Sequence, residues 1–191
     1  MEKEINIMKR EEAMELFHEY NETESLRRHG YAVMAVMEHF AKERGEDEDY
    51  WGTIGLLHDL DYEKYPKEHC IKTREILEGR GIEEEMIHSI ESHAYGMCTE
   101  VKPELPMEMV LYTIDELTGL IVATVLMRPD KSILPLEVKS VKKKFKTVKF
   151  AAGVNREVIL KGCEMINMDL NDVIFHAIEG MKAKATLLSL A

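Results

Sequence analysis

The sequence predicts an all-α fold, and three observations support that expectation. Apolar residues recur at helical spacing along nearly the whole chain, whereas the alternating pattern of β-branched residues that marks strands is scarce. No internal repeat or low-complexity segment interrupts this pattern. The 191 residues are enough to bury one sizeable core but short for two independent domains. We therefore expect one compact multi-helix bundle over residues 1–191.

Breaking and capping residues divide the first half of the chain into helices. Asn21–Thr23 offers a break followed by a new cap, Gly45 offers a stop, and Pro66 marks a further break. The acidic run Glu46–Asp49 places negative charge at the positive end of the helix that it begins. We expect helices over residues 8–20, 24–44, about 46–59 and about 67–79, and one that opens at 81–84 and carries His93 near its end.

The longest and most apolar expected helix spans Met107–Met127, after a loop punctuated by Pro103 and Pro106. Asp115 puts a charge in the middle of this helix. Burying a carboxylate there without a partner would be costly, and a metal ion is an obvious partner. Three further helices are expected to form a C-terminal extension over about 137–188, at residues 137–150, 156–166 and 170–188.

The net charge of -11 limits the partners that this chain can bind. An acidic surface repels nucleic acids and anionic membranes, so we expect neither general nucleic-acid binding nor membrane binding. A small anionic substrate would have to find a locally positive pocket.

Cysteine usage and the first residues indicate a cytoplasmic protein. Cys70, Cys98 and Cys163 are odd in number, far apart and without a Cys-x-x-Cys pair, so neither a disulfide framework nor a zinc ribbon is expected. The segment Met1–Ile5 lacks a basic region followed by an apolar core. The longest apolar runs fall short of the ~20 residues that a membrane span needs.

The most informative stretch is the apolar run Gly55–Asp61, which contains a histidine directly followed by an aspartate. An imidazole nitrogen and a carboxylate oxygen at the end of a buried element suit a metal site, because both donate lone pairs and neither packs well unpaired. Further histidines and an aspartate complete the order H, HD, H, H, D. These six candidate ligands are His29, His58, Asp59, His69, His93 and Asp115. The other four histidines, His18, His39, His88 and His176, fit no ordered pattern.

In this order the chain resembles the HD superfamily of metal-dependent phosphohydrolases, over the stretch from about His29 to Asp115. The resemblance implies an HD-type domain whose metal-binding core spans about 22–127. The two intervening histidines are similar to the subset of the superfamily that binds a second metal. Asp61 stands where many relatives have glycine, and Ala94 stands where members that cleave cyclic dinucleotides usually have histidine. That branch, which also has a Gly-Tyr-Pro motif absent here, is not expected.

Resemblance and ligand chemistry together suggest a ligand assignment. One ion would be held by His29, His58, Asp59 and Asp115. A second ion, about 3.5–4 Å from the first, would be held by His69, His93 and the other oxygen of Asp59. Mixed imidazole and carboxylate ligands suit Fe, Mn, Co, Ni or Zn. A single-ion site remains open, with His69 and His93 contacting substrate or serving the structure. A buried hydrogen-bonded cluster without metal is the further alternative.

The resemblance implies hydrolysis of a phosphoester in a nucleotide or related small phosphorylated molecule, through a metal-bound hydroxide. Asp59 would act as the bridging catalytic residue, and Lys64 could assist as a cation, although a solvated loop lysine is the simpler interpretation. Two alternatives remain open. Some superfamily members with this six-ligand pattern are mixed-valent di-iron oxygenases, and this chain could instead be a catalytically idle sensor or binding module.

A lysine-rich segment stands out in this acidic chain. Lys139–Lys149 holds six lysines and no acid, and a helix drawn over it separates an apolar stripe from a cationic one. Lys142 and Lys146 lie on the cationic stripe. We expect either an ordinary solvated face or a ridge that draws phosphate groups toward the metal pocket.

Overall fold

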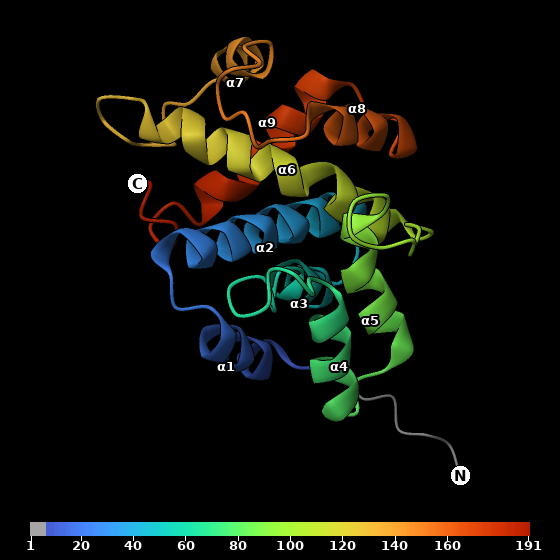
Figure 1. The fold of residues 1–191 in the computed structure, drawn as a ribbon. Helices are drawn as coiled ribbons and strands as arrows, with labels where there is room; N and C mark the ends of the chain where they lie inside the picture. The colour runs from blue at the N-terminus through green and yellow to red at the C-terminus, as the bar shows by residue number, and fades with distance from the viewer. Residues whose placement is uncertain (1–6) are drawn as a thin grey trace.

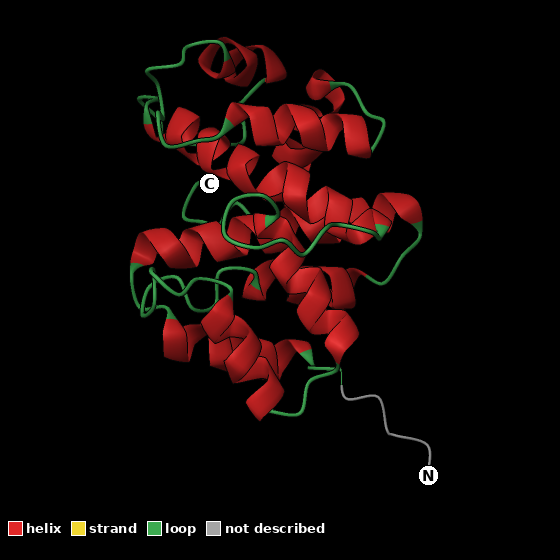
Figure 2. Ribbon diagram, turned by 45° about the vertical axis from the view of Figure 1, so that its right-hand side comes forward, coloured by secondary structure: helices red, strands yellow, loops and turns green. Residues whose placement is uncertain are grey.

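The computed structural model describes residues 7–191, so Met1–Ile5, whose sequence predicts no targeting segment, lies outside the described residues. Within 7–191 the chain forms nine α-helices, one 3-10 helix and no strand, which confirms the predicted all-α class (Figures 1 and 2). The elements in order are α1 (Arg10–Tyr20), α2 (Glu24–Arg44), α3 (Glu48–Leu57), α4 (Ile71–Gly79), α5 (Glu84–Glu91), η1 (Ser92–Ala94), α6 (Pro106–Leu126), α7 (Val138–Phe145), α8 (Arg156–Met165) and α9 (Leu170–Ala183).

Local sequence signals determine several helix ends. Asp47 caps α3, because its carboxylate accepts a hydrogen bond from the backbone N–H of Tyr50 at 3.0 Å. Gly45 ends α2 in the left-handed conformation, with φ of 72°, which glycine adopts without a steric penalty. Asn155 and Asp169 cap α8 and α9 in the same way as Asp47 caps α3.

The helices α2 and α6 form the centre of the fold (Figure 1). In Figure 1, α2 crosses the middle of the molecule, with α3 below it and α6 above it, and it contacts α3, α6 and α9. By length and composition α6 could cross a membrane, although the sequence was expected to hold no apolar run long enough to do so. However, 61% of its most apolar window is buried inside this fold.

Two glycines allow close approach where the candidate ligands lie. A Cβ on Gly55 of α3 would stand 3.2 Å from the carbonyl oxygen of Val33 and 2.8 Å from Cγ of Met37, both on α2. A Cβ on Gly162 of α8 would stand 2.7 Å from Cα of Thr113 on α6. The first contact presses α3 against α2, and the second packs the C-terminal extension against the helix that carries Asp115.

Several helices are shorter than the sequence predicts, and His93, expected near the end of the fifth helix, lies in η1 after α5 has ended at residue 91. The helix α4 begins at residue 71 instead of 67, α7 ends at 145 instead of 150, and α9 ends at 183 instead of 188. At α7 a tertiary contact explains the difference. The guanidinium of Arg156 donates to the backbone carbonyls of Phe145 (2.9 Å), Ala151 (3.1 Å) and Val154 (2.9 Å). These bonds hold 146–154 in turns.

Candidate metal centre

The structure brings the six predicted ligand residues together from five parts of the chain, and we call this set the six-residue centre. His29 lies on the second turn of α2, and His58 and Asp59 follow the end of α3. His69 lies in the turn before α4, His93 in η1, and Asp115 in the middle of α6. His29 and Asp115 thus lie within long helices, the others lie at or between helix ends, and helix packing brings all six to one point.

The first cluster consists of His29, His58 and Asp115 with one oxygen of Asp59. Oδ1 of Asp115 lies 2.9 Å from Nε2 of His29 and 3.3 Å from Nε2 of His58. Oδ2 of Asp59 lies 3.6 Å and 3.4 Å from the same two nitrogens. Four donor atoms thus surround one small volume.

The second cluster consists of His69 and His93 with the other oxygen of Asp59. The two Nε2 atoms are 3.2 Å apart, and Oδ1 of Asp59 lies 3.4 Å from His69 and 3.5 Å from His93. Asp59 therefore faces one cluster with each carboxylate oxygen, which is the arrangement that a bridging ligand needs.

Hydrogen bonds orient all four imidazoles. Each Nδ1 faces a protein acceptor, which indicates that in the neutral ring Nδ1 carries the proton and Nε2 presents its lone pair to the centre. The acceptors are the carbonyl oxygen of Gly55 for His58 (2.8 Å), that of Ile90 for His93 (2.6 Å), Oδ1 of Asp61 for His69 (2.7 Å) and the hydroxyl of Thr118 for His29 (3.4 Å).

The charges of the first cluster are strongly coupled. Burial opposes protonation of His58, but the carboxylates of Asp59 and Asp115 outweigh it and raise the pKa of His58 well above 6.5. Burial alone would raise the pKa of each carboxyl group, but His58 and the other imidazoles hold both values well below 3.8. A divalent cation would satisfy the same carboxylates without these protons, so the donor set fits a metal.

A cavity of about 350 Å³ opens onto the centre. His58 lies beneath it and is fully buried, whereas the other five residues of the centre line the cavity. No lysine or arginine is among the residues that line this cavity in the described chain. The other lining residues are Leu26, Tyr62, Ala94, Met97, Cys98, Glu116, Gly119, Gly153 and Val154.

The structure does not bring Lys64 to this cavity. Its Nζ donates to the carbonyl oxygen of Glu19 at 2.7 Å and lies 4.6 Å from the ring centroid of Tyr20, both on α1. A direct catalytic role for Lys64 does not fit this placement, because the contacts of its amine are to a neighbouring helix that supplies no residue of the centre.

Lys142 and Lys146 also lie away from the cavity walls. Lys142 is on α7 and Lys146 follows its last residue, and α7 packs against α6 and α9. Neither is among the residues that line the cavity in the described part of the chain. Long-range attraction of phosphate groups by this ridge stays a prediction.

Three residues near the centre were missed as candidates. Asp61 bonds to His69, Glu116 lines the cavity, and one ligand atom each of Cys70, His69 and His93 lie within 4.8 Å of one another. Burial raises the pKa of the Cys70 thiol, so a metal would have to displace its proton. All three stand within two residues of a predicted ligand in the sequence, and this proximity is a signal that could have found them.

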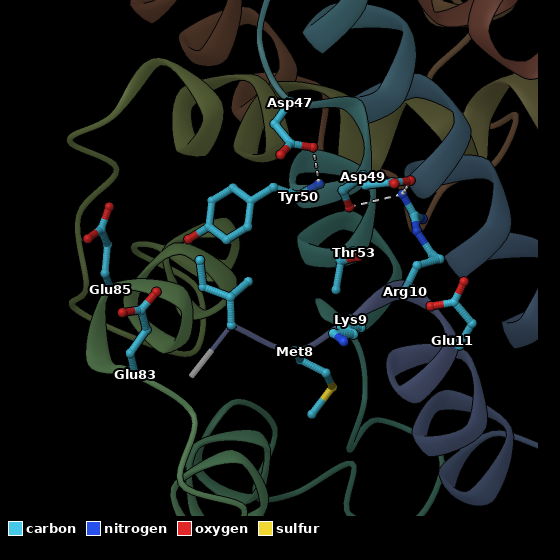
Figure 3. A pocket seen from close by; sticks show the side chains of 11 residues that line it. Met8, Lys9, Arg10, Glu11, Asp47, Asp49, Tyr50, Thr53, Glu83 and Glu85 are labelled. Atoms are coloured by element: carbon cyan, nitrogen blue, oxygen red, sulfur yellow. Dashed lines mark hydrogen bonds and ion pairs between the residues drawn. The ribbon is translucent and has the colours of Figure 1, made fainter. Parts of the chain in front are cut away.

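A larger cavity of about 780 Å³ lies elsewhere, and none of the six residues lines it. Figure 3 shows Glu83 and Glu85 on one side of it and Arg10 on the other. Arg10 bonds to the carbonyl oxygen of Asp49 at 3.0 Å and to Glu38 at 3.0 Å. These contacts join α1 to α2 and α3.

The remaining histidines pair outside the centre. His18 bonds to Tyr31, and His39 bonds to His176 with 3.0 Å between ring nitrogens. His88 bonds to Glu108 at 2.9 Å.

Comparison with known families matches residues 26–142 to the HD domain. This match includes all six residues of the centre and extends past the predicted core of about 22–127 into α7. Comparisons with curated proteins and with solved structures gave no significant match. Because the match covers more than half of the chain and the order and convergence of the histidines and aspartates agree with it, the chain belongs to the HD domain family.

Proposed function

We propose that this protein is a metal-dependent phosphohydrolase acting on a nucleotide or another small phosphorylated molecule. One observation carries the proposal: the two oxygens of Asp59 face two separate groups of imidazole nitrogens, within 3.4–3.6 Å. Membership of the HD domain family supports it, because this family consists mostly of metal-dependent phosphohydrolases.

The residues of the first cluster would hold one ion and those of the second cluster a second ion, with Asp59 shared. Fe, Mn, Co, Ni and Zn suit these nitrogen and oxygen donors. When bound, such ions lower the pKa of a water molecule and neutralise charge on phosphoryl oxygens. The protein's part is to hold Nε2 of each imidazole toward the centre, and the Nδ1 hydrogen bonds fix this orientation.

The charges of the cavity walls make binding of an anionic substrate depend on the metal ions. Asp59, Asp115 and Glu116 line the cavity, and no described lining residue is a lysine or an arginine. A phosphate group would be repelled from these walls unless ions offset the carboxylates. Substrate binding should therefore depend on metal, and the volume of about 350 Å³ suits a small molecule or one end of a larger one.

Glu116 is the carboxyl group that we propose as proton donor to the leaving group. Its Oε2 accepts the backbone N–H of Asn155 at 3.0 Å. Burial raises its pKa above 4.5, and the neighbouring charges of Asp115 and Asp59 raise it further. Because Glu116 also lines the cavity, we propose that its carboxyl group supplies the proton that the leaving group takes up.

A phosphatase screen with separately loaded Mn²⁺, Co²⁺, Ni²⁺, Fe²⁺ and Zn²⁺ tests the proposal. We expect phosphate release from at least one small phosphoester, with none from metal-free protein or from the Asp59→Asn variant. Glu116→Gln should lower kcat most for substrates with poor leaving groups while leaving the metal content unchanged. A fully loaded protein that releases phosphate from no ester would refute the phosphohydrolase assignment.

The same donor set would also suit an oxygenase with two irons of different valence. Oxygen consumption by iron-loaded protein without phosphate release would favour that function. A protein that binds its ions but does neither would be a sensor or binding module.

We also propose a cytoplasmic location. All three cysteines are free, and Cys98 is exposed, which is compatible with a reducing compartment.

A further inference from the structure

We propose that Asp61 is a positioning residue that holds His69 in the tautomer and orientation needed to bind the second ion. This inference rests on the proposed two-ion centre. Asp61 follows Asp59 by two residues, is fully buried and does not line the cavity. Its role would therefore be exerted through His69.

Both oxygens of Asp61 are engaged. Oδ1 accepts the Nδ1–H of His69 at 2.7 Å, and Oδ2 accepts the backbone N–H of Thr73 at 2.9 Å. A buried carboxylate is costly unless such bonds satisfy it, so its presence in the core requires these two partners. The carboxylate spans the gap between the side chain of His69 and the start of α4.

The second bond compensates for a missing cap. Cys70 occupies the N-cap position of α4, has φ of 68° and makes no side-chain cap bond. Thr73 is the third residue of α4, where a cap acceptor normally receives the N–H group. Asp61 supplies that acceptor from twelve residues away, and Cys70 directly follows His69. One side chain thus sets both the helix start and the adjacent imidazole.

The first bond sets the tautomer of His69. A carboxylate can only accept, so the proton must reside on Nδ1, and Nε2 then presents its lone pair toward His93 and Asp59. The other three imidazoles of the centre donate to backbone carbonyls or to a hydroxyl. Among the four, His69 is the one whose orientation depends on a side-chain charge, so the second ion should be selectively sensitive to Asp61.

Asp61→Asn separates the two bonds. The amide oxygen of asparagine can still accept from Thr73, so α4 keeps its cap. The amide nitrogen must then face Nδ1 of His69 as a donor, which favours the tautomer with the proton on Nε2. We expect affinity for the second ion to fall about 10- to 100-fold, with the first ion unaffected. Equilibrium dialysis of Co²⁺ or Mn²⁺ with elemental analysis measures the affinities for both ions.

Asp169→Asn is the matched control. Asp169 caps α9 through the backbone N–H of Asn171 at 2.8 Å and lies outside the centre. The Asp169→Asn substitution likewise removes one negative charge from a helix cap, so the affinities for both ions should stay at wild-type values. Loss of the second ion in this variant as well would show that the effect comes from helix capping or net charge, which would overturn the inference.

A double variant tests whether Asp61 acts through His69. His69→Ala should lower the affinity for the second ion, and adding Asp61→Asn to this variant should lower that affinity no further. An additional loss, or tight binding of two ions by Asp61→Asn alone, would overturn the inference, as would a wild-type protein that binds only one ion. None of these measurements uses phosphatase activity, so they can fail while the proposed hydrolase stands.

Nitrogen NMR of the metal-free wild-type protein gives a test that needs no variant to fold. We expect the His69 ring to be protonated at Nδ1 in the neutral form. A neutral His69 that carries its proton on Nε2 would refute the role of Asp61.

Discussion

Replacing Asp59 should weaken the binding of both ions, whereas replacing Asp115 should weaken the binding of only one. Asp59 lies within 3.4–3.6 Å of four imidazoles in both clusters. Asp115 forms ion pairs with His29 and His58, both in the first cluster. Asparagine keeps the shape of each side chain and removes its charge, so Asp59→Asn and Asp115→Asn form a matched pair.

The geometry sets the size of the effect. Two unit charges 3.4 Å apart, the distance from Asp59 to His58 and to His69, attract by about 5 kcal/mol at an effective dielectric constant of about 20. A divalent ion would increase the attraction, and desolvation of ion and carboxylate would offset much of it. We therefore expect a loss of about 2–5 kcal/mol per ion, which weakens binding by about 30- to 5000-fold.

Metal titration by equilibrium dialysis with elemental analysis, run beside circular dichroism, measures this loss. Asp59→Asn should retain its helical signal and lose both ions, and Asp115→Asn should retain the ion of the second cluster. If Asp59→Asn loses one ion and binds the other at wild-type affinity, Asp59 does not bridge, and the reasoning fails.

Four further predictions follow from the same geometry. Because the two carboxylates of the centre raise the pKa of His58 above 6.5, a metal ion must compete with a tightly held proton. The affinity for metal should therefore rise between pH 6 and pH 8 in titrations at fixed ionic strength, and a flat profile would contradict this. Lys64→Ala should leave kcat unchanged in steady-state assays, since its amine is bonded to α1. Lys142→Glu combined with Lys146→Glu should raise KM and reduce the salt dependence of kcat/KM without changing metal content, whereas unaltered kinetics across a salt series would show an ordinary surface. Gly162→Ala should lower the free energy of unfolding by about 1–3 kcal/mol in urea titrations, because its Cβ would overlap α6, and wild-type stability would show that α8 moves away freely.

Local signals in the sequence determined much of the secondary structure. The range 24–44 is the helix that the sequence predicts, and the cap at Asp47 and the stop at Gly45 lie where the residue types require them. Such features depend on neighbours along the chain, so one sequence is enough to find them. The order of His29, the His58–Asp59 pair and Asp115 likewise indicated the family that the comparison confirmed.

The ends of other helices depended on distant contacts. Arg156 holds the carbonyls that follow α7, so five residues with helical spacing form turns instead. Nothing near residue 145 in the sequence indicates that guanidinium, since its position there results from the packing of the C-terminal helices.

Tertiary structure alone decided how the side chains of the centre are divided and supported. The sequence suggested that Asp59 could bridge, but the packing of α3 against α2 and α5, and of α2 against α6, directs its two oxygens to different imidazoles. The same packing holds Lys64 on α1 and places Asp61 behind His69. Sequence patterns report periodicity and residue type over short distances, whereas the direction in which a side chain points across a core depends on which helices meet there.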